Sequence, residues 1–201
     1  MTKNVTNIAV ATVTAAAFIV FMTTLARAVL FSPEAELSIP EEQTASPIVV
    51  EAEPTELPDR LVIPTLGIDT KVQHVGLGKS GNMAVPSNYT DVGWYRYGPV
   101  PGARGSAVID GHLDNGFGMD AVFKHLEELK QGDLITVVAS DGTEQEFEVE
   151  SVISYPREAV PLERVFNRDD RPRLNLITCT GDWNNEVKSY DQRVVVYAVL
   201  V

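Results

Sequence analysis

The chain contains one cysteine, Cys179, and a thiol acts as a nucleophile when a base and a carbonyl-stabilising group are brought to it. Residues 173–181 form a short apolar run that passes through Cys179 and leads to Gly181 and Asp182. The run alternates like a strand about five residues long, and Gly with Asp favours a turn after it. We therefore expect Cys179 at a strand end, opening into a loop. Because a lone cysteine is often only a small buried side chain, its chemistry depends on its partners.

The candidate bases are three histidines. His112 follows Gly111 at the end of an apolar strand predicted over residues 106–110, where a side chain is presented at the rim of a sheet. His125 lies inside a helix-like pattern and is interpreted as a helix-surface or half-buried residue. His74 follows a strand and precedes a glycine, and is interpreted as a surface residue. His112 is therefore the candidate general acid and base.

Arg193 begins a valine-rich segment, residues 193–201, that is apolar on both faces and therefore typical of a central or barrel-forming strand. A guanidinium is costly in such a place unless it meets an anion or a developing oxyanion. The alternative is an arginine whose stem packs at the strand end while its head reaches water.

Several short strands are expected to position these residues. The composition, with 14 Gly, 12 Pro and 7% aromatic residues, favours a loop-rich β domain over a helical bundle. Asp141-Gly142 predicts a hairpin between two apolar segments. One helix of about ten residues is predicted between Asp120 and Gly132, and a short one over residues 162–166. We expect a mainly β fold, a closed or nearly closed barrel of roughly seven or eight strands with one or two short helices.

Three regions differ in composition. Residues 1–31 include an uncharged run of about 23 residues, long enough at about 1.5 Å per residue to cross a membrane, and are interpreted as an N-terminal anchor. A cleaved signal peptide is the alternative, since Ala26-Arg27-Ala28 resembles a cleavage site. Residues 32–56 carry seven Glu with repeated Pro and predict an extended acidic tether. Residues 57–201 form the remaining domain, and either interpretation places it outside the cytoplasm.

The charge and the ligand inventory exclude some functions. The formal net charge is −12, which argues against nucleic acid as a partner because phosphate contacts require a basic face. No His and Cys residues occur at metal-ligand spacing, and acidic loops alone do not specify calcium, so we expect neither a metal nor another cofactor.

Three segments together resemble the sortases, the cysteine transpeptidases of Gram-positive cell surfaces. They are Ala107-Val108-Ile109-Asp110-Gly111-His112, Leu176-Ile177-Thr178-Cys179 and Arg193-Val194-Val195-Val196-Tyr197-Ala198. Each is weak alone, but they occur in order, after a candidate anchor, in a chain with one cysteine. Gly111-His112-Leu113-Asp114 is most similar to the actinobacterial class F group. Asn175 stands where the family usually has threonine, which bears on the class and not on the nucleophile.

The resemblance implies a function and a role for each residue. Cys179 would attack the Thr carbonyl of a Leu-Pro-x-Thr-Gly-like sorting signal on a secreted protein, and a cell-wall precursor amine would resolve the thioacyl enzyme. His112 would transfer protons, and Arg193 would hold the carbonyl or oxyanion. Thr178 would line the substrate pocket or simply pack in its strand. The location implied is the cell membrane, with a single span and an extracytoplasmic domain. The alternatives are a tethered surface domain that only binds, and a hydrolase of the sorting signal.

Overall fold

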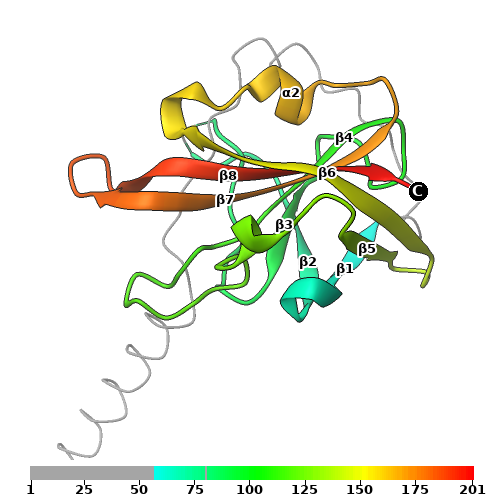
Figure 1. Ribbon diagram of the computed structural model, residues 1–201, viewed down its shortest axis with the longest axis horizontal. Helices are drawn as coiled ribbons and strands as arrows, with labels where there is room; N and C mark the ends of the chain where they lie inside the picture. The colour runs from blue at the N-terminus through cyan, green and yellow to red at the C-terminus, as the bar shows by residue number, and fades with distance from the viewer. Residues whose placement is uncertain (1–56, 80) are drawn as a thin grey trace, which may run out of the picture.

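Eight strands close into one barrel in the computed structural model, which describes residues 57–79 and 81–201 (Figure 1). The strands are β1 (Pro58–Ile63), β2 (Ile68–Val75), β3 (Val92–Tyr95), β4 (Gly105–Asp110), β5 (Leu134–Ala139), β6 (Glu144–Pro156), β7 (Pro172–Asn184) and β8 (Ser189–Leu200). Their order around the barrel is β1-β2-β3-β4-β7-β8-β6-β5. The pairs β2/β3 and β4/β7 are parallel and the other neighbours are antiparallel. This confirms the predicted closed, mainly β barrel.

The helices are short. They are the 3₁₀ turns η3 (Pro64–Leu66), η4 (Leu126–Glu128) and η5 (Arg157–Ala159) and the α-helix α2 (Leu162–Phe166), which confirms the short helix predicted there. The longer helix predicted between Asp120 and Gly132 is wrong, since only η4 forms. Phe123, Leu126 and Leu129 are all buried, and their spacing of three residues matches the 3₁₀ period and not the 3.6-residue period of an α-helix.

The strands β7 and β8 are buried on both faces. Alternate residues of β7, Leu174 and Leu176, point into the barrel with the Val194 and Val196 side chains of β8. The intervening residues belong to a second apolar cluster, in which Ile177 of β7 packs with side chains from α2 and from the loop between β2 and β3. In Figure 1 α2 lies above the β6, β7 and β8 ribbons. The prediction that the last strand is central is therefore confirmed, and β7 presents odd-numbered residues to the face that α2 covers.

The β7–β8 hairpin corrects the predicted position of Cys179. β7 was expected to be about five residues long and to end at the cysteine, but it has 13 residues and continues to Asn184. Gly181 adopts a φ of 83°, the register shifts between Thr180 and Trp183, and the backbone N–H of Asp182 donates to Asp191 at 2.8 Å. The glycine and aspartate thus form a bulge inside the hairpin where a turn was predicted, because the partner strand supplies hydrogen bonds beyond it.

The Asp141-Gly142 hairpin is confirmed. It joins β5 to β6, Gly142 has a φ of 88°, and the Asp141 side chain accepts from the Thr143 backbone N–H at 2.9 Å. The positive φ at position 142 favours glycine there.

The candidate anchor, residues 1–31, and the candidate tether, residues 32–56, lie outside the described residues and stay predictions. Within residues 57–79 and 81–201, no helix has the length and apolar character needed to cross a membrane.

Candidate active site

Cys179 and Arg193 are directly paired across β7 and β8. Opposite residues of an antiparallel pair project to the same face with their Cβ atoms about 4.5–5.5 Å apart. Residues two apart in a strand share a face, so both side chains point to the face that α2 covers. The sequence predicted both residues for the site, and the strand register brings them together.

Arg193 is buried, with 5% of its surface exposed, and its guanidinium is held by the hairpin itself. Nη1 donates to the carbonyl oxygens of Tyr190 at 2.9 Å and Gln192 at 2.7 Å, and Nη2 donates to the Ser189 hydroxyl at 2.9 Å. Burial lowers the pKa of Arg193, while the neighbouring Cys179 raises it. These contacts set a cation beside the thiol, and within residues 57–79 and 81–201 no carboxylate forms an ion pair with it, so the guanidinium can stabilise a developing oxyanion.

The segment before His112 is attached to β7 at the residues that precede Cys179. The Gly111 backbone N–H donates to the Ile177 carbonyl oxygen at 3.2 Å, and the Thr178 hydroxyl donates to the Gly111 carbonyl oxygen at 2.8 Å. A Cβ at position 111 would lie 2.5 Å from the Phe123 ring, so this close approach requires glycine. Thr178 therefore helps to fix the loop through its hydrogen bond. Its contact with substrate stays a prediction.

The His112 ring is held in one orientation. Its Nε2 lies 3.1 Å from the Pro86 carbonyl oxygen, and its ring tilts against Tyr89 with centroids 5.1 Å apart. Because a carbonyl oxygen only accepts hydrogen bonds, Nε2 carries a proton and Nδ1 is the basic nitrogen of the neutral ring. Burial lowers the pKa of His112, whereas the Pro86 contact and the charge of Asp114 raise it.

The other two histidines lie away from this arrangement. His125 is exposed and its Nδ1 contacts Glu128 at 2.7 Å, which confirms the surface interpretation. His74 is exposed as well, which confirms its surface interpretation, although its Nε2 lies 2.7 Å from the Pro58 carbonyl oxygen and its ring stands edge-on to Trp94. The parallel pairing of β2 with β3 brings Trp94 beside His74, a contact between strands that sequence spacing does not reveal.

Cys179 is half-buried, and its surroundings favour the neutral thiol. Burial raises the pKa of Cys179, Arg193 lowers it, and the carboxyl groups of Asp110 and Asp114 raise it further. The resting site therefore holds mostly a protonated thiol and a neutral imidazole, and the thiolate–imidazolium pair is a minor population.

Asp110 is a residue that sequence reasoning missed. It lies at the end of β4, its side chain is 4% exposed, and its Oδ1 has no hydrogen-bond partner among the described residues. Gly93, opposite it on β3, leaves the space for this carboxyl: a Cβ there would lie 2.6 Å from Asp110 Oδ1. Burial raises the pKa of Asp110 well above its usual value. Its position within the strand that leads to His112 was the only available signal.

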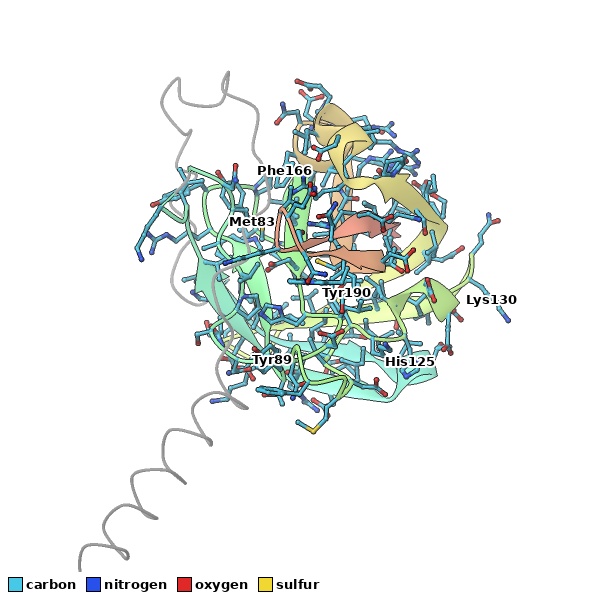
Figure 2. All side chains as sticks on the ribbon, turned by 90° about the vertical axis from the view of Figure 1, so that its left-hand side faces the viewer. Met83, Tyr89, His125, Lys130, Phe166 and Tyr190 are labelled. Carbon is cyan, nitrogen blue, oxygen red and sulfur yellow. The ribbon has the colours of Figure 1, made fainter. Side chains whose placement is uncertain are left out.

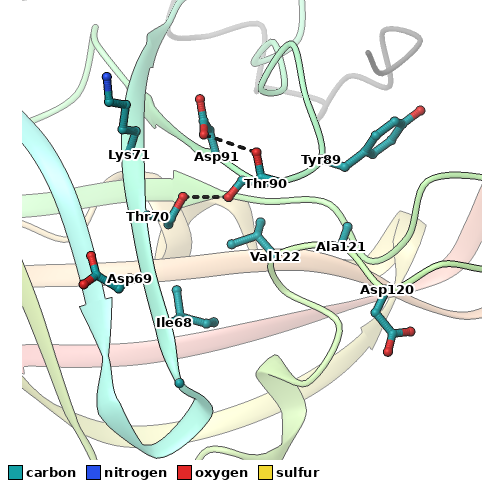
Figure 3. Close-up of a pocket in the computed structure, with 11 residues that line it drawn as sticks. Ile68, Asp69, Thr70, Lys71, Tyr89, Thr90, Asp91, Asp120, Ala121 and Val122 are labelled. Carbon is teal, nitrogen blue, oxygen red and sulfur yellow. Dashed lines mark hydrogen bonds between the residues drawn. The ribbon is translucent and has the colours of Figure 1, made fainter. Parts of the chain in front are cut away.

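An open surface pocket of about 560 Å³ is lined in part by Tyr89 (Figure 3). It is bounded by residues 67–71, 89–91 and 120–122, and Tyr89 is the lining residue that also contacts the His112 ring. Its carboxylates have partners, since Asp69 pairs with Arg60 and Asp91 accepts from Asn88. Among the described residues no group of three or more His, Cys, Asp or Glu could hold a metal ion.

The sequence model of the sortase domain matches residues 61–201, which is most of the chain. The chain therefore belongs to the sortase family, a family of cysteine transpeptidases. No curated protein matches the sequence significantly.

Solved structures support the fold. Sortase A from Corynebacterium diphtheriae is 24% identical with a TM-score of 0.53, and the match covers 72% of this chain and 60% of that one. Sortase C-1 from Actinomyces oris is 23% identical with a TM-score of 0.52, covering 80% and 81%. The Sortase D5 transpeptidase of Clostridium perfringens is 19% identical with a TM-score of 0.51, covering 72% and 78%. The likeness to class F stays a prediction.

Proposed function

We propose that this sortase cleaves a Leu-Pro-x-Thr-Gly-like sorting signal between Thr and Gly and transfers the acyl group to a cell-wall amine. The observation that carries the proposal is the pairing of Cys179 with Arg193, beside the backbone contacts that bring the His112 loop to the same end of β7. A nucleophile, a base and a cationic donor are the parts that acyl transfer through a thioester requires.

Each residue has a defined role in the first half-reaction. His112 takes the thiol proton on Nδ1, and the Cys179 sulfur bonds to the Thr carbonyl carbon. Arg193 donates hydrogen bonds to the oxyanion. When the Thr–Gly bond breaks, the imidazolium gives its proton to the leaving amine, and a thioester remains on Cys179. In the second half-reaction His112 takes a proton from the incoming amine, the amine nitrogen bonds to the acyl carbon, and the thiolate leaves and is reprotonated.

Burial limits the reactive form of the enzyme. Free groups with pKa values near 8.5 and 6.5 already give less than about 1% of the thiolate–imidazolium pair at neutral pH. Burial raises the pKa of Cys179 and lowers that of His112, so both shifts decrease this population further. Arg193 acts in the opposite direction on the thiol. The thiolate–imidazolium pair therefore stays scarce unless a bound substrate carbonyl reacts with the thiolate as it forms.

The partners and location follow from the same proposal. The substrates are secreted proteins with the sorting signal, the acceptor is a cell-wall precursor amine, and residues 1–31 hold the enzyme in the cell membrane with its barrel on the extracytoplasmic side. No metal, other cofactor or nucleic acid takes part.

The test is incubation of the protein with a Leu-Pro-x-Thr-Gly peptide and an amine, read by mass spectrometry. We expect a ligated product and an acyl adduct on Cys179. Cys179→Ala should abolish both, and Arg193→Lys should lose most activity, because a point charge does not reproduce the guanidinium fork. Thermal unfolding of each variant checks the fold.

The outcomes separate the alternatives. Hydrolysed peptide at the same rate with and without amine would identify a hydrolase. Absence of an adduct across a panel of sorting motifs, in folded protein, would refute the proposal and favour a binding domain.

A further inference from the structure

A side-chain contact joins the loop after His112 to the hairpin that carries Arg193. The Tyr190 hydroxyl of β8 donates a hydrogen bond to the Asp114 carboxylate, across 76 residues of sequence. Tyr190 lies on the side of the molecule that faces the viewer in Figure 2. In the sequence, Asp114 stands out only through the class resemblance, and Tyr190 carries no signal. We call this contact the Asp114–Tyr190 clasp.

On the hairpin side, Tyr190 is held at both its backbone and its ring. Its carbonyl oxygen accepts from Arg193 Nη1 at 2.9 Å, so the residue that holds Asp114 also holds the guanidinium. Its ring meets the Trp183 ring across the hairpin at 5.3 Å and 75°. A displacement of Tyr190 therefore moves one of the acceptors that orient Arg193.

On the loop side, Asp114 sits in a compact turn. Its Oδ1 accepts from the Gly116 backbone N–H at 2.9 Å. The buried Asn115 side chain accepts from the backbone N–H groups of Phe117 and Met119 at 3.0 and 3.2 Å. Since Asp114 is two residues from His112, fixing its carboxylate limits the motion of the loop that carries the base.

We propose that Asp114 and Tyr190 are positioning residues for the transfer reaction: the clasp holds the His112 loop and Arg193 at fixed places on either side of Cys179. This inference rests on the proposed function. Neither residue contacts the reacting atoms; Asp114 acts through His112, and Tyr190 acts through Arg193. The hydrogen bond is partly buried and has a charged acceptor, and hydrogen bonds to an ionised group are the stronger kind.

Asp114 also contributes charge. Burial is the main influence on both reacting groups, raising the pKa of Cys179 and lowering that of His112. The Asp114 carboxylate raises both pKa values, because it disfavours a thiolate and favours an imidazolium. The other charged groups that act on Cys179 are Arg193 and Asp110. The phenol of Tyr190, whose pKa burial and Asp114 raise to about 12, stays neutral at working pH.

The first test is peptide ligation by the full chain. Tyr190→Phe should lower kcat/KM about tenfold or more, mainly through kcat, since the geometry and not the peptide affinity is lost. Asp114→Asn should lose a similar factor, and the double variant should lose little more than either one, because both substitutions remove the same contact. Tyr97→Phe, which removes a hydroxyl that accepts from Arg96, is the matched control and should keep wild-type rates.

A pH profile distinguishes positioning from a merely structural role. Asp114→Asn removes a charge that raises both pKa values, so both limbs of the kcat/KM profile should move to lower pH. Tyr190→Phe leaves that charge in place and should lower the maximum without moving the limbs. If Asp114→Asn lowers the maximum of the kcat/KM profile but leaves both of its limbs at the same pH, the electrostatic part of the proposal is overturned.

Hydrogen exchange tests the clasp without a substrate. In Tyr190→Phe, backbone amides of residues 112–120 should exchange faster than in wild type, with no change in Tyr97→Phe. If the wild-type protein ligates no sorting peptide, the proposed function is refuted, and the role of the clasp in that function is refuted with it. An active wild type with a fully active Tyr190→Phe, additive losses in the double variant, or unchanged exchange over residues 112–120 would refute the clasp alone.

Discussion

The buried carboxyl of Asp110 should make the stability of this protein fall as pH rises above the acidic range. The side chain is 4% exposed, and its Oδ1 has no partner among the described residues. Burial raises the pKa of Asp110 well above its usual value, so the folded protein keeps a proton that the unfolded chain releases. Asp110→Asn has nearly the same shape and cannot ionise, which isolates this effect.

The size of the effect follows from proton linkage. Between the unfolded and the folded pKa of Asp110 the native state binds one more proton than the unfolded state, so unfolding becomes easier with rising pH. Each pH unit in that window costs the wild type about 1.4 kcal/mol relative to Asp110→Asn. Below the unfolded pKa, near 3.9, the difference between the two proteins is constant, and it becomes constant again above the folded pKa.

The assay is urea unfolding of wild type and Asp110→Asn at a series of pH values from about 4 to 7. The stability of the variant relative to wild type should grow from the acidic end by at least about 1.4 kcal/mol. The exposed Asp59, changed to Asn, is measured in parallel so that the general effect of removing one negative charge is subtracted. A difference between wild type and Asp110→Asn that does not change across the series would refute the inference that the carboxyl is buried in its neutral form.

Two further predictions concern neighbouring residues. Gly93→Ala should destabilise the protein by about 1–3 kcal/mol, because the new Cβ would lie 2.6 Å from Asp110 Oδ1 and 3.0 Å from Val75 Cγ1. Urea unfolding should show a smaller loss in an Asp110→Ala background, and equal losses in the two backgrounds would contradict the contact. Cys179 should react with iodoacetamide more slowly than free cysteine at neutral pH, with a midpoint above about 8.5, since burial raises its pKa. A midpoint below that of free cysteine would show that Arg193 outweighs burial.

Local sequence patterns were sufficient for several elements. Asp141-Gly142 predicted its hairpin because the positive φ of the turn, found at Gly142, restricts the residue types that fit there. The valine-rich residues of β8 predicted a strand buried on both faces. The helix predicted between Asp120 and Gly132 was wrong, because Phe123, Leu126 and Leu129 are buried at every third position, which is the period of a 3₁₀ turn.

Local sequence patterns could not predict contacts between strands that are distant in the sequence. Gly181 and Asp182 have the chemistry of a turn, yet β8 pairs with β7 past them and converts them to a bulge. The burial of Asp110 depends on the glycine at position 93, and the edge-on ring contact of His74 depends on Trp94 of the neighbouring strand. In each case a residue's environment is set by a neighbour in space whose distance along the chain carries no periodic signal.

The sequence by itself determined the residue types available for chemistry: one thiol, three imidazoles and an arginine at the start of an apolar segment. It also determined the family resemblance, because three ordered segments suffice for that. Only the tertiary structure decided the pairing of Cys179 with Arg193, the basic nitrogen of His112 and the clasp between Asp114 and Tyr190. These depend on strand register and loop closure, which bring donors and acceptors within about 3 Å and are properties of the closed barrel as a whole.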